Sequence, residues 1–154
     1  MNLMEIKMEG GGGFTFTEII MVLGIIAVLA LLTAPLGINF YREQMLDEAT
    51  YDILLALRRA QNQAISQRAD SRFGLNFSAE PSAYILFQGD TYATRNVAAD
   101  ERFYLPFGIS VLGISEVVFG NLNGVPNWNG VITVSALGNS AQININVQGK
   151  IERQ

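Results

Sequence analysis

The chain has 154 residues, with 10 Lys and Arg against 14 Asp and Glu, so its formal net charge is −4. This length suits one domain with a membrane anchor, and the acidic balance argues against a general nucleic-acid binder, which needs a basic face. Cys and His are both absent. Their absence excludes a disulfide scaffold, a Cys/His zinc site, a Ser-His-Asp triad and a Cys-His dyad.

Residues 1–13 differ in character from the remainder of the chain. They contain Lys7 between two glutamates and end in four glycines, Gly10 to Gly13, which cannot hold a helix. An ordinary secretory signal would carry a short apolar core followed by a small-residue cleavage site. The apolar run here is longer and comes after the glycines, so we predict a disposable leader at 1–13 with the cut before that run.

The next segment, 14–41, is apolar. From Ile19 to Tyr41 there is no charged residue, and these 23 residues would rise about 35 Å as a helix, enough to cross a hydrocarbon core of about 30 Å. Glu18 stands directly before them, where a carboxylate is costly. Pro35 removes one backbone hydrogen bond and predicts a kink or local melting.

The stretch Gly13-Phe14-Thr15-Phe16-Thr17-Glu18 resembles the processing motif of type IV prepilins. The resemblance implies that a prepilin peptidase cuts between Gly13 and Phe14 and methylates the new amine of Phe14. Phe16 and Thr17 replace the two aliphatic residues usual before the glutamate, and the leader is less basic than is usual. A plain anchor that is never cut is the competing interpretation, but it leaves Glu18 unexplained.

Glu18 itself has a local and a longer-range interpretation. As a first-turn carboxylate it is favoured by the helix dipole. After cleavage Phe14 carries a free amine, and a buried carboxylate requires a cation. That amine lies four residues away in the same helix. The resemblance implies that Glu18 also pairs with the amine of a neighbouring subunit, so Phe14 and Glu18 are the candidate assembly residues.

The helix is predicted to continue to about residue 69 with a different pattern. One apolar stripe has helical spacing, and it consists of Leu46, Ala49, Ile53, Leu57, Ala60 and Ala64. Polar and charged residues cover the other faces, among them Arg58 and Arg59. The stripe therefore requires a partner surface within the domain 42–154.

Residues 72–154 are predicted to form that surface as short strands. The expected ranges are 72–77, 84–88 with a continuation at 91–94, 103–105, 109–112, 116–119, 131–136, 141–147 and 150–152. The clearest hairpin joins 131–136 to 141–147, where Ile143, Ile145 and Val147 alternate with polar residues and should face the core. The predicted fold class is α+β: a long N-terminal helix, transmembrane in its first half, packed on one antiparallel sheet.

This arrangement resembles the GspH/FimT-like minor pilins and pseudopilins, through the processing motif, the helix segment 54–67 and the terminal hairpin 130–151. The resemblance implies a pilin-like structural subunit of a type IV pilus or a type II secretion pseudopilus, anchored in the inner membrane with its C-terminal domain outside the cytoplasm. The implied partners are prepilin peptidase, other pilin or pseudopilin subunits, the inner-membrane assembly platform and membrane lipid. No cofactor or metal is expected.

Two other functions remain open. A membrane-tethered binding module would capture DNA or an exported protein without polymerising, although the acidic balance disfavours DNA. An enzyme would require an acid–base constellation, and Asp100, Glu101 and Glu116 have no recognisable partner. The aromatic residues between 84 and 128 are interpreted as core and rim of the sheet rather than as a stacking platform for single strands. Arg58, Arg59, Arg68 and Arg72 are interpreted as a solvated face.

Overall fold

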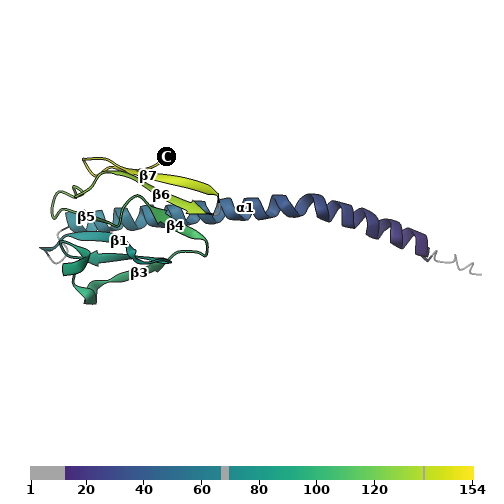
Figure 1. The fold of residues 1–154 in the computed structure, drawn as a ribbon, viewed down its shortest axis with the longest axis horizontal. Helices are drawn as coiled ribbons and strands as arrows, with labels where there is room; N and C mark the ends of the chain where they lie inside the picture. The colour runs from purple at the N-terminus through teal and green to yellow at the C-terminus, as the bar shows by residue number, and fades with distance from the viewer. Residues whose placement is uncertain (1–12, 67–69, 137) are drawn as a thin grey trace, which may run out of the picture. The chain divides into compact units, whose positions relative to one another are not determined.

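The computed structural model describes residues 13–66, 70–136 and 138–154, and for residues 32–39 of the first helix it describes the backbone only. The fold is α+β, as predicted (Figure 1). The chain divides into two compact units, Met1–Asn39 and Phe40–Gln154. One helix, α1 (Phe16–Ile65), contributes to both.

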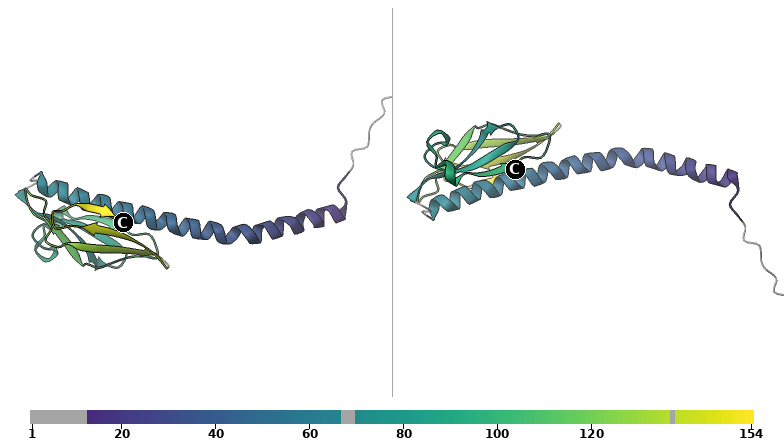
Figure 2. Two further views of the ribbon diagram at one scale, coloured as in Figure 1. Left: turned by 90° about the horizontal axis from the view of Figure 1, so that it is seen from above. Right: turned by 90° about the horizontal axis from the view of Figure 1, so that it is seen from below.

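Two four-stranded antiparallel sheets complete the second unit. The first has the order β3-β2-β1-β5, with β1 at Phe73–Glu80, β2 at Ala83–Gln88, β3 at Glu101–Tyr104 and β5 at Glu116–Phe119. The second has the order β4-β6-β7-β8, with β4 at Ile109–Leu112, β6 at Gly130–Ala136, β7 at Asn139–Ile145 and β8 at Ile151–Arg153. Both sheets lie on one flank of the second half of α1 (Figure 2).

The predicted helix stripe is confirmed as the centre of the core. All six of its residues are buried, and they pack in one cluster with side chains from both sheets, including Leu75, Phe119 and Ile143. The adjacent Thr50 is also buried, and its hydroxyl donates to the carbonyl of Leu46 at 2.6 Å. The second half of the helix therefore packs against both sheets.

The prediction of a single sheet is wrong. β4 and β5 follow each other in sequence, yet β4 pairs with β6 and β5 pairs with β1. Gly113 lies between them with a φ of +109°, and a Cβ there would approach the carbonyl oxygen of Val131 to 2.6 Å. Only glycine accepts both conditions, so Gly113 lets the chain leave one sheet for the other.

Two smaller strand predictions are also wrong. Residues Tyr92–Thr94 form a 3₁₀ helix (η2), capped by the side chain of Thr91, which accepts from the Thr94 N–H, instead of continuing the meander. Val147, predicted to be buried, is 60% exposed. The reason is Asn146, whose Oδ1 accepts the backbone N–H groups of Gln148 and Lys150 and turns the chain after β7 ends.

The end of α1 is fixed by a loop that is distant in sequence. The helix ends at Ile65 rather than at about residue 69, and 67–69, with Arg68, lie outside the described residues. The carbonyl of Ala64 accepts the N–H of Leu122, and the Gln61 amide donates to the carbonyls of Gly124 and Gly149 at 3.0 and 2.7 Å. The bond to Ala64 satisfies a carbonyl that a helix end otherwise leaves open.

Candidate functional site

The first candidate site is the beginning of α1. Gly13 and Phe14 are exposed and lie before the helix, and Thr15 provides its cap, with its hydroxyl accepting the N–H of Glu18 at 3.3 Å. Thr15 and Glu18 have the spacing of a capping box, in which the acidic residue occupies the third helical position. Glu18 is therefore a first-turn carboxylate, as the local interpretation of the sequence predicts.

This carboxylate borders an apolar surface. Phe14, Glu18, Ile19, Val22 and Leu23 line a shallow hollow of about 240 Å³. Every residue from Phe14 to Leu31 is exposed, although most of these side chains are large and apolar. A contiguous apolar surface of this kind marks a site of contact with protein or lipid.

Three expectations for this segment stay predictions: cleavage at Gly13–Phe14, methylation of Phe14 and pairing of Glu18 with another subunit. Residues 1–12 of the predicted leader lie outside the described residues. Pro35 falls within α1, in the part described by backbone alone, and its kink also stays a prediction. Among the described residues, no helix combines the length and apolarity that crossing a membrane requires, so the predicted span is not confirmed.

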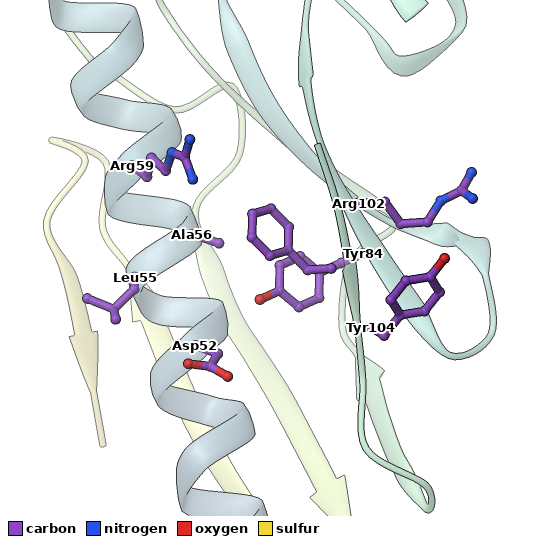
Figure 3. Close-up of a pocket in the computed structure, with 8 residues that line it drawn as sticks. Asp52, Leu55, Ala56, Arg59, Tyr84, Arg102 and Tyr104 are labelled. Atoms are coloured by element: carbon purple, nitrogen blue, oxygen red, sulfur yellow. The ribbon is translucent and has the colours of Figure 1, made fainter. Parts of the chain in front are cut away.

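The second candidate site is a groove in the globular unit that sequence reasoning missed. It has a volume of about 440 Å³ and lies between the exposed side of α1 and the strands β2 and β3 (Figure 3). The helix contributes residues at positions 52, 55, 56 and 59, and the sheet contributes Tyr84, Arg102, Phe103 and Tyr104. Separately, these residues look like core, rim and solvated face; only the tertiary fold brings them together.

The groove has an aromatic floor. Tyr84 is buried and stacks on Phe103, with ring centroids 5.1 Å apart and planes 12° apart. Burial, reinforced by the nearby charge of Asp52, raises the pKa of Tyr84 to about 12. The phenol is neutral at physiological pH, as an ordinary tyrosine is, and offers a hydroxyl group on the helix side of the sheet (Figure 3).

The rim of the groove is charged but paired. Arg59 contacts Glu101 at 2.7 Å, and Arg102 contacts Glu80 at 2.9 Å. A side-chain hydrogen bond with Tyr104, and then the charge of Glu80, raise the pKa of Arg102. Since both guanidinium groups already have carboxylate partners, the rim does not offer free positive charge to a phosphate backbone.

The outer edge of β3 borders this groove and pairs with no strand among the described residues. β3 is the last strand of its sheet, and the Leu105 N–H donates to the Ser82 carbonyl at 2.8 Å. Hydrogen-bonded pairs alternate along an antiparallel ladder. The backbone groups of Phe103 therefore face β2, whereas those of Arg102 and Tyr104 point to the free edge. Such an edge can accept an additional strand.

Other predicted residues have structural roles. Arg58 donates to the carbonyl of Ile151 at 3.2 Å, so it anchors β8 to the helix. Asp100 pairs with Arg95 at 2.9 Å, and Arg95 also lies 3.6 Å from the centre of the Tyr92 ring. Glu116 accepts the N–H of Tyr92. Within the described ranges, no group of three or more Asp and Glu residues is arranged to hold a metal ion.

The comparisons with known proteins agree with this architecture. No protein-family model matches the chain, and no curated protein matches it. The fold is similar to the solved structure of EpsH, a minor pseudopilin of the type 2 secretion system of Vibrio cholerae, with a TM-score of 0.54 and 12% sequence identity. The similarity covers 71% of this chain and 95% of EpsH. The chain therefore has a pseudopilin-like fold.

Proposed function

We propose that the chain is a structural subunit, of the minor class, in a type II secretion pseudopilus or a type IV pilus. The observation that carries this proposal is the combination of a pseudopilin-like fold with an exposed apolar helix that has an acidic residue, Glu18, in its capped first turn. The mechanism is assembly rather than catalysis.

In this proposal the leader 1–13 is removed by prepilin peptidase after Gly13, and the amine of Phe14 is methylated. The exposure of Gly13 and Phe14 before the first helical turn supports access by a peptidase. The segment 14–41 then holds the subunit in the inner membrane, with the globular domain outside the cytoplasm. An assembly platform moves it into a filament, where helices of other subunits replace lipid around its apolar side chains.

Glu18 sets the register of this assembly. A carboxylate transferred into an apolar helix bundle requires a cation, and the amine of a neighbouring Phe14 supplies one. The apolar surface around Glu18 supports this role because its side chains have no cover among the described residues of the chain. Lipid and then neighbouring helices would provide that cover in turn.

The substitution Glu18→Val tests the proposal. Val should not impair membrane insertion, since removing a carboxylate from an apolar helix is favourable. It should sharply reduce entry into filaments, because breaking a buried ion pair costs about 3–5 kcal/mol. The measurement is the ratio of variant to wild-type subunit in sheared filaments, normalised to the membrane pool.

The control is Glu43→Val, which removes an exposed carboxylate from the same helix beyond the apolar segment. It should enter filaments as the wild type does. Equal incorporation of the Glu18 and Glu43 variants would contradict the assembly role of Glu18. The intact mass of the mature subunit tests processing separately: a chain that begins at Phe14 with one added methyl group is expected, and a retained leader would refute the cut.

The groove beside β3 favours a second candidate function, a membrane-tethered binding module. Its open strand edge and aromatic floor suit an extended segment of an exported protein better than DNA, because Arg59 and Arg102 are already paired with carboxylates. Co-purification with sheared filaments separates the two functions: a filament subunit is recovered with them, whereas a module that does not polymerise stays in the membrane fraction.

A further inference from the structure

Four exposed aromatic residues mark one end of the globular unit. Phe40 and Tyr41 begin the part of α1 that belongs to this unit, Tyr104 ends β3, and Phe107 follows it. Phe107 is 96% exposed and Tyr104 is 75% exposed. We call these four residues the aromatic end. Large apolar side chains are ordinarily buried. Core packing does not explain these four, because all of them are exposed.

Strand register limits how far the loop of Phe107 extends along this part of the helix. Arg153 of β8 pairs with Asp47, and Arg153 lies opposite Ile143 of β7. From Ile143 to Asn139 the strand extends up to about 13 Å further. That length is an upper limit and corresponds to about nine helical residues before Asp47, so this end of the strand can reach the level of Phe40.

The pairing then leads from β7 to the loop. Asn139 lies opposite Ala136 of β6, and Ala136 lies opposite Ile109 of β4. Phe107 is two residues before Ile109, and the Ile109 N–H donates to the carbonyl of Pro106 at 3.1 Å. Figure 1 shows the connection from β3 to β4 at the same end of the unit as the last residues of β6 and the first residues of β7.

The opposite end of the unit offers a contrast. Val97 begins the short 3₁₀ helix η3 (Val97–Ala99), whose next two residues share a pocket with Gln63, near the end of α1. Val97 is also apolar and 66% exposed. Neither of its sequence neighbours, Asn96 and Ala98, is aromatic, so it is a single exposed apolar residue of the ordinary kind.

We propose that, before assembly, the aromatic end rests on the membrane surface, with Phe107 inserted among lipid headgroups. This inference rests on the proposed membrane anchor. The occupant is lipid because Phe40 and Tyr41 are the last residues of the charge-free segment that begins at Ile19. Aromatic side chains are enriched where a membrane segment meets water. Phe107 would add an aromatic residue from the sheet to the two that the helix places at this interface.

The contact gives the unassembled subunit a defined orientation. A domain that is tethered by one helix alone can tilt, whereas a second contact at Phe107 restricts it. The next charged residues along the helix are Arg42, Glu43, Asp47 and Glu48, and Asp47 is paired with Arg153. The two remaining carboxylates, Glu43 and Glu48, outnumber Arg42 and so favour a neutral lipid surface over an anionic one. When the subunit leaves the membrane for the filament, Phe107 would leave the lipid headgroups together with the helix.

The experiment uses single-cysteine variants of the full chain, which has no native Cys, so one added thiol carries one environment-sensitive fluorophore. Pro106→Cys reports on the loop with Phe107 intact. Val97→Cys is the matched control at the opposite end, and Ile20→Cys reports on the apolar helix. Each labelled chain is reconstituted in phosphatidylcholine vesicles that contain a nitroxide-labelled lipid with the nitroxide near the headgroup.

Quenching at position 106 should exceed quenching at position 97 by about threefold, reflecting interfacial depth. It should fall to the level of position 97 when Phe107→Asn is added, a change that removes no buried contact because the side chain is almost fully exposed. Equal quenching at 106 and 97, with strong quenching at 20, would overturn the inference and leave the membrane anchor intact.

Two other outcomes are equally decisive. A blue-shifted emission at 106 that nitroxide lipid does not quench would show that protein, such as a second copy, covers the loop instead of lipid. Absence of quenching at position 20 would refute the membrane anchor itself, and the inference would fail with it. The reporters at 20 and 106 thus separate failure of the proposed function from failure of the aromatic end.

Discussion

The two ends of α1 have opposite surroundings although they belong to one helix. From Phe14 to Leu31 the residues are exposed and almost all apolar, whereas from Leu46 to Ala64 an apolar stripe is buried beneath two sheets. The second region has its partner within the same chain. The first exposes a comparable apolar surface among the described residues, and the proposed function assigns its cover to another molecule.

The sharpest test of this contrast uses the same substitution in both regions. Ile53→Ala removes a side chain that is 0% exposed, so we expect it to lower the free energy of unfolding of the globular unit by about 2–5 kcal/mol. Ile26→Ala removes a side chain that is 55% exposed, and the expected change is within about 0.5 kcal/mol.

Urea unfolding of the full chain in detergent, followed by the fluorescence of Trp128, measures both variants. Trp128 packs against the core of the globular unit, so its signal reports on that unit. Equal destabilisation by the two variants would mean that the beginning of α1 is covered within the chain, and the case for an external partner would fail.

The next effect concerns the groove and depends on pH. The pKa of Tyr84 is raised to about 12 by burial and by Asp52, above its ordinary value of 10.0. As the pH rises, the unfolded chain therefore loses this proton first. The stabilisation is fully present below about pH 10 and is lost as the pH rises towards 12.

The variant Tyr84→Phe should thus lose less stability than the wild type between pH 9 and 11.5, by about 2 kcal/mol or less. Tyr51→Phe changes an exposed tyrosine of the same unit and should follow the wild type. Urea midpoints at the two pH values provide the measurement. A wild-type curve that matches the Tyr84 variant would indicate that the phenol is hydrated and that the groove floor is open to water.

Sequence patterns predicted the local features of the second region well. Helical spacing identified all six buried stripe residues, and the ranges 109–112 and 116–119 coincide with β4 and β5. Alternation also identified the buried faces of Ile143 and Ile145. These features depend on periodicity within one segment, which a single sequence displays directly.

Features that depend on distant partners could not be predicted in this way. The separation into two sheets follows from the pairing of Phe73 with Phe119 and of Ile109 with Ala136. The groove combines the exposed side of a helix with a strand edge, and each of these looks ordinary in sequence. For the first region the sequence supplied a specific motif, but its proposed partners are other molecules, which lie outside the structure of one chain.

The smallest expected effects are those of two threonine substitutions, one at Thr50 within α1 and one at Thr15, its N-cap. Thr50 is buried and its hydroxyl bonds to Leu46, so Thr50→Ala should lower the free energy of unfolding of the globular unit by about 1 kcal/mol. Thr15 is an exposed cap whose loss costs its helix about 0.5–2 kcal/mol. Because that cost falls on the first turn alone, Thr15→Ala should leave urea unfolding of the globular unit unchanged. Hydrogen exchange of the Glu18 and Ile19 amides, which bond to Thr15, should instead become about fivefold faster, the factor that about 1 kcal/mol produces. If Thr15→Ala shifted the unfolding of the globular unit as Thr50→Ala does, the two regions would unfold together, and the beginning of α1 would be part of the domain rather than a segment that depends on external partners.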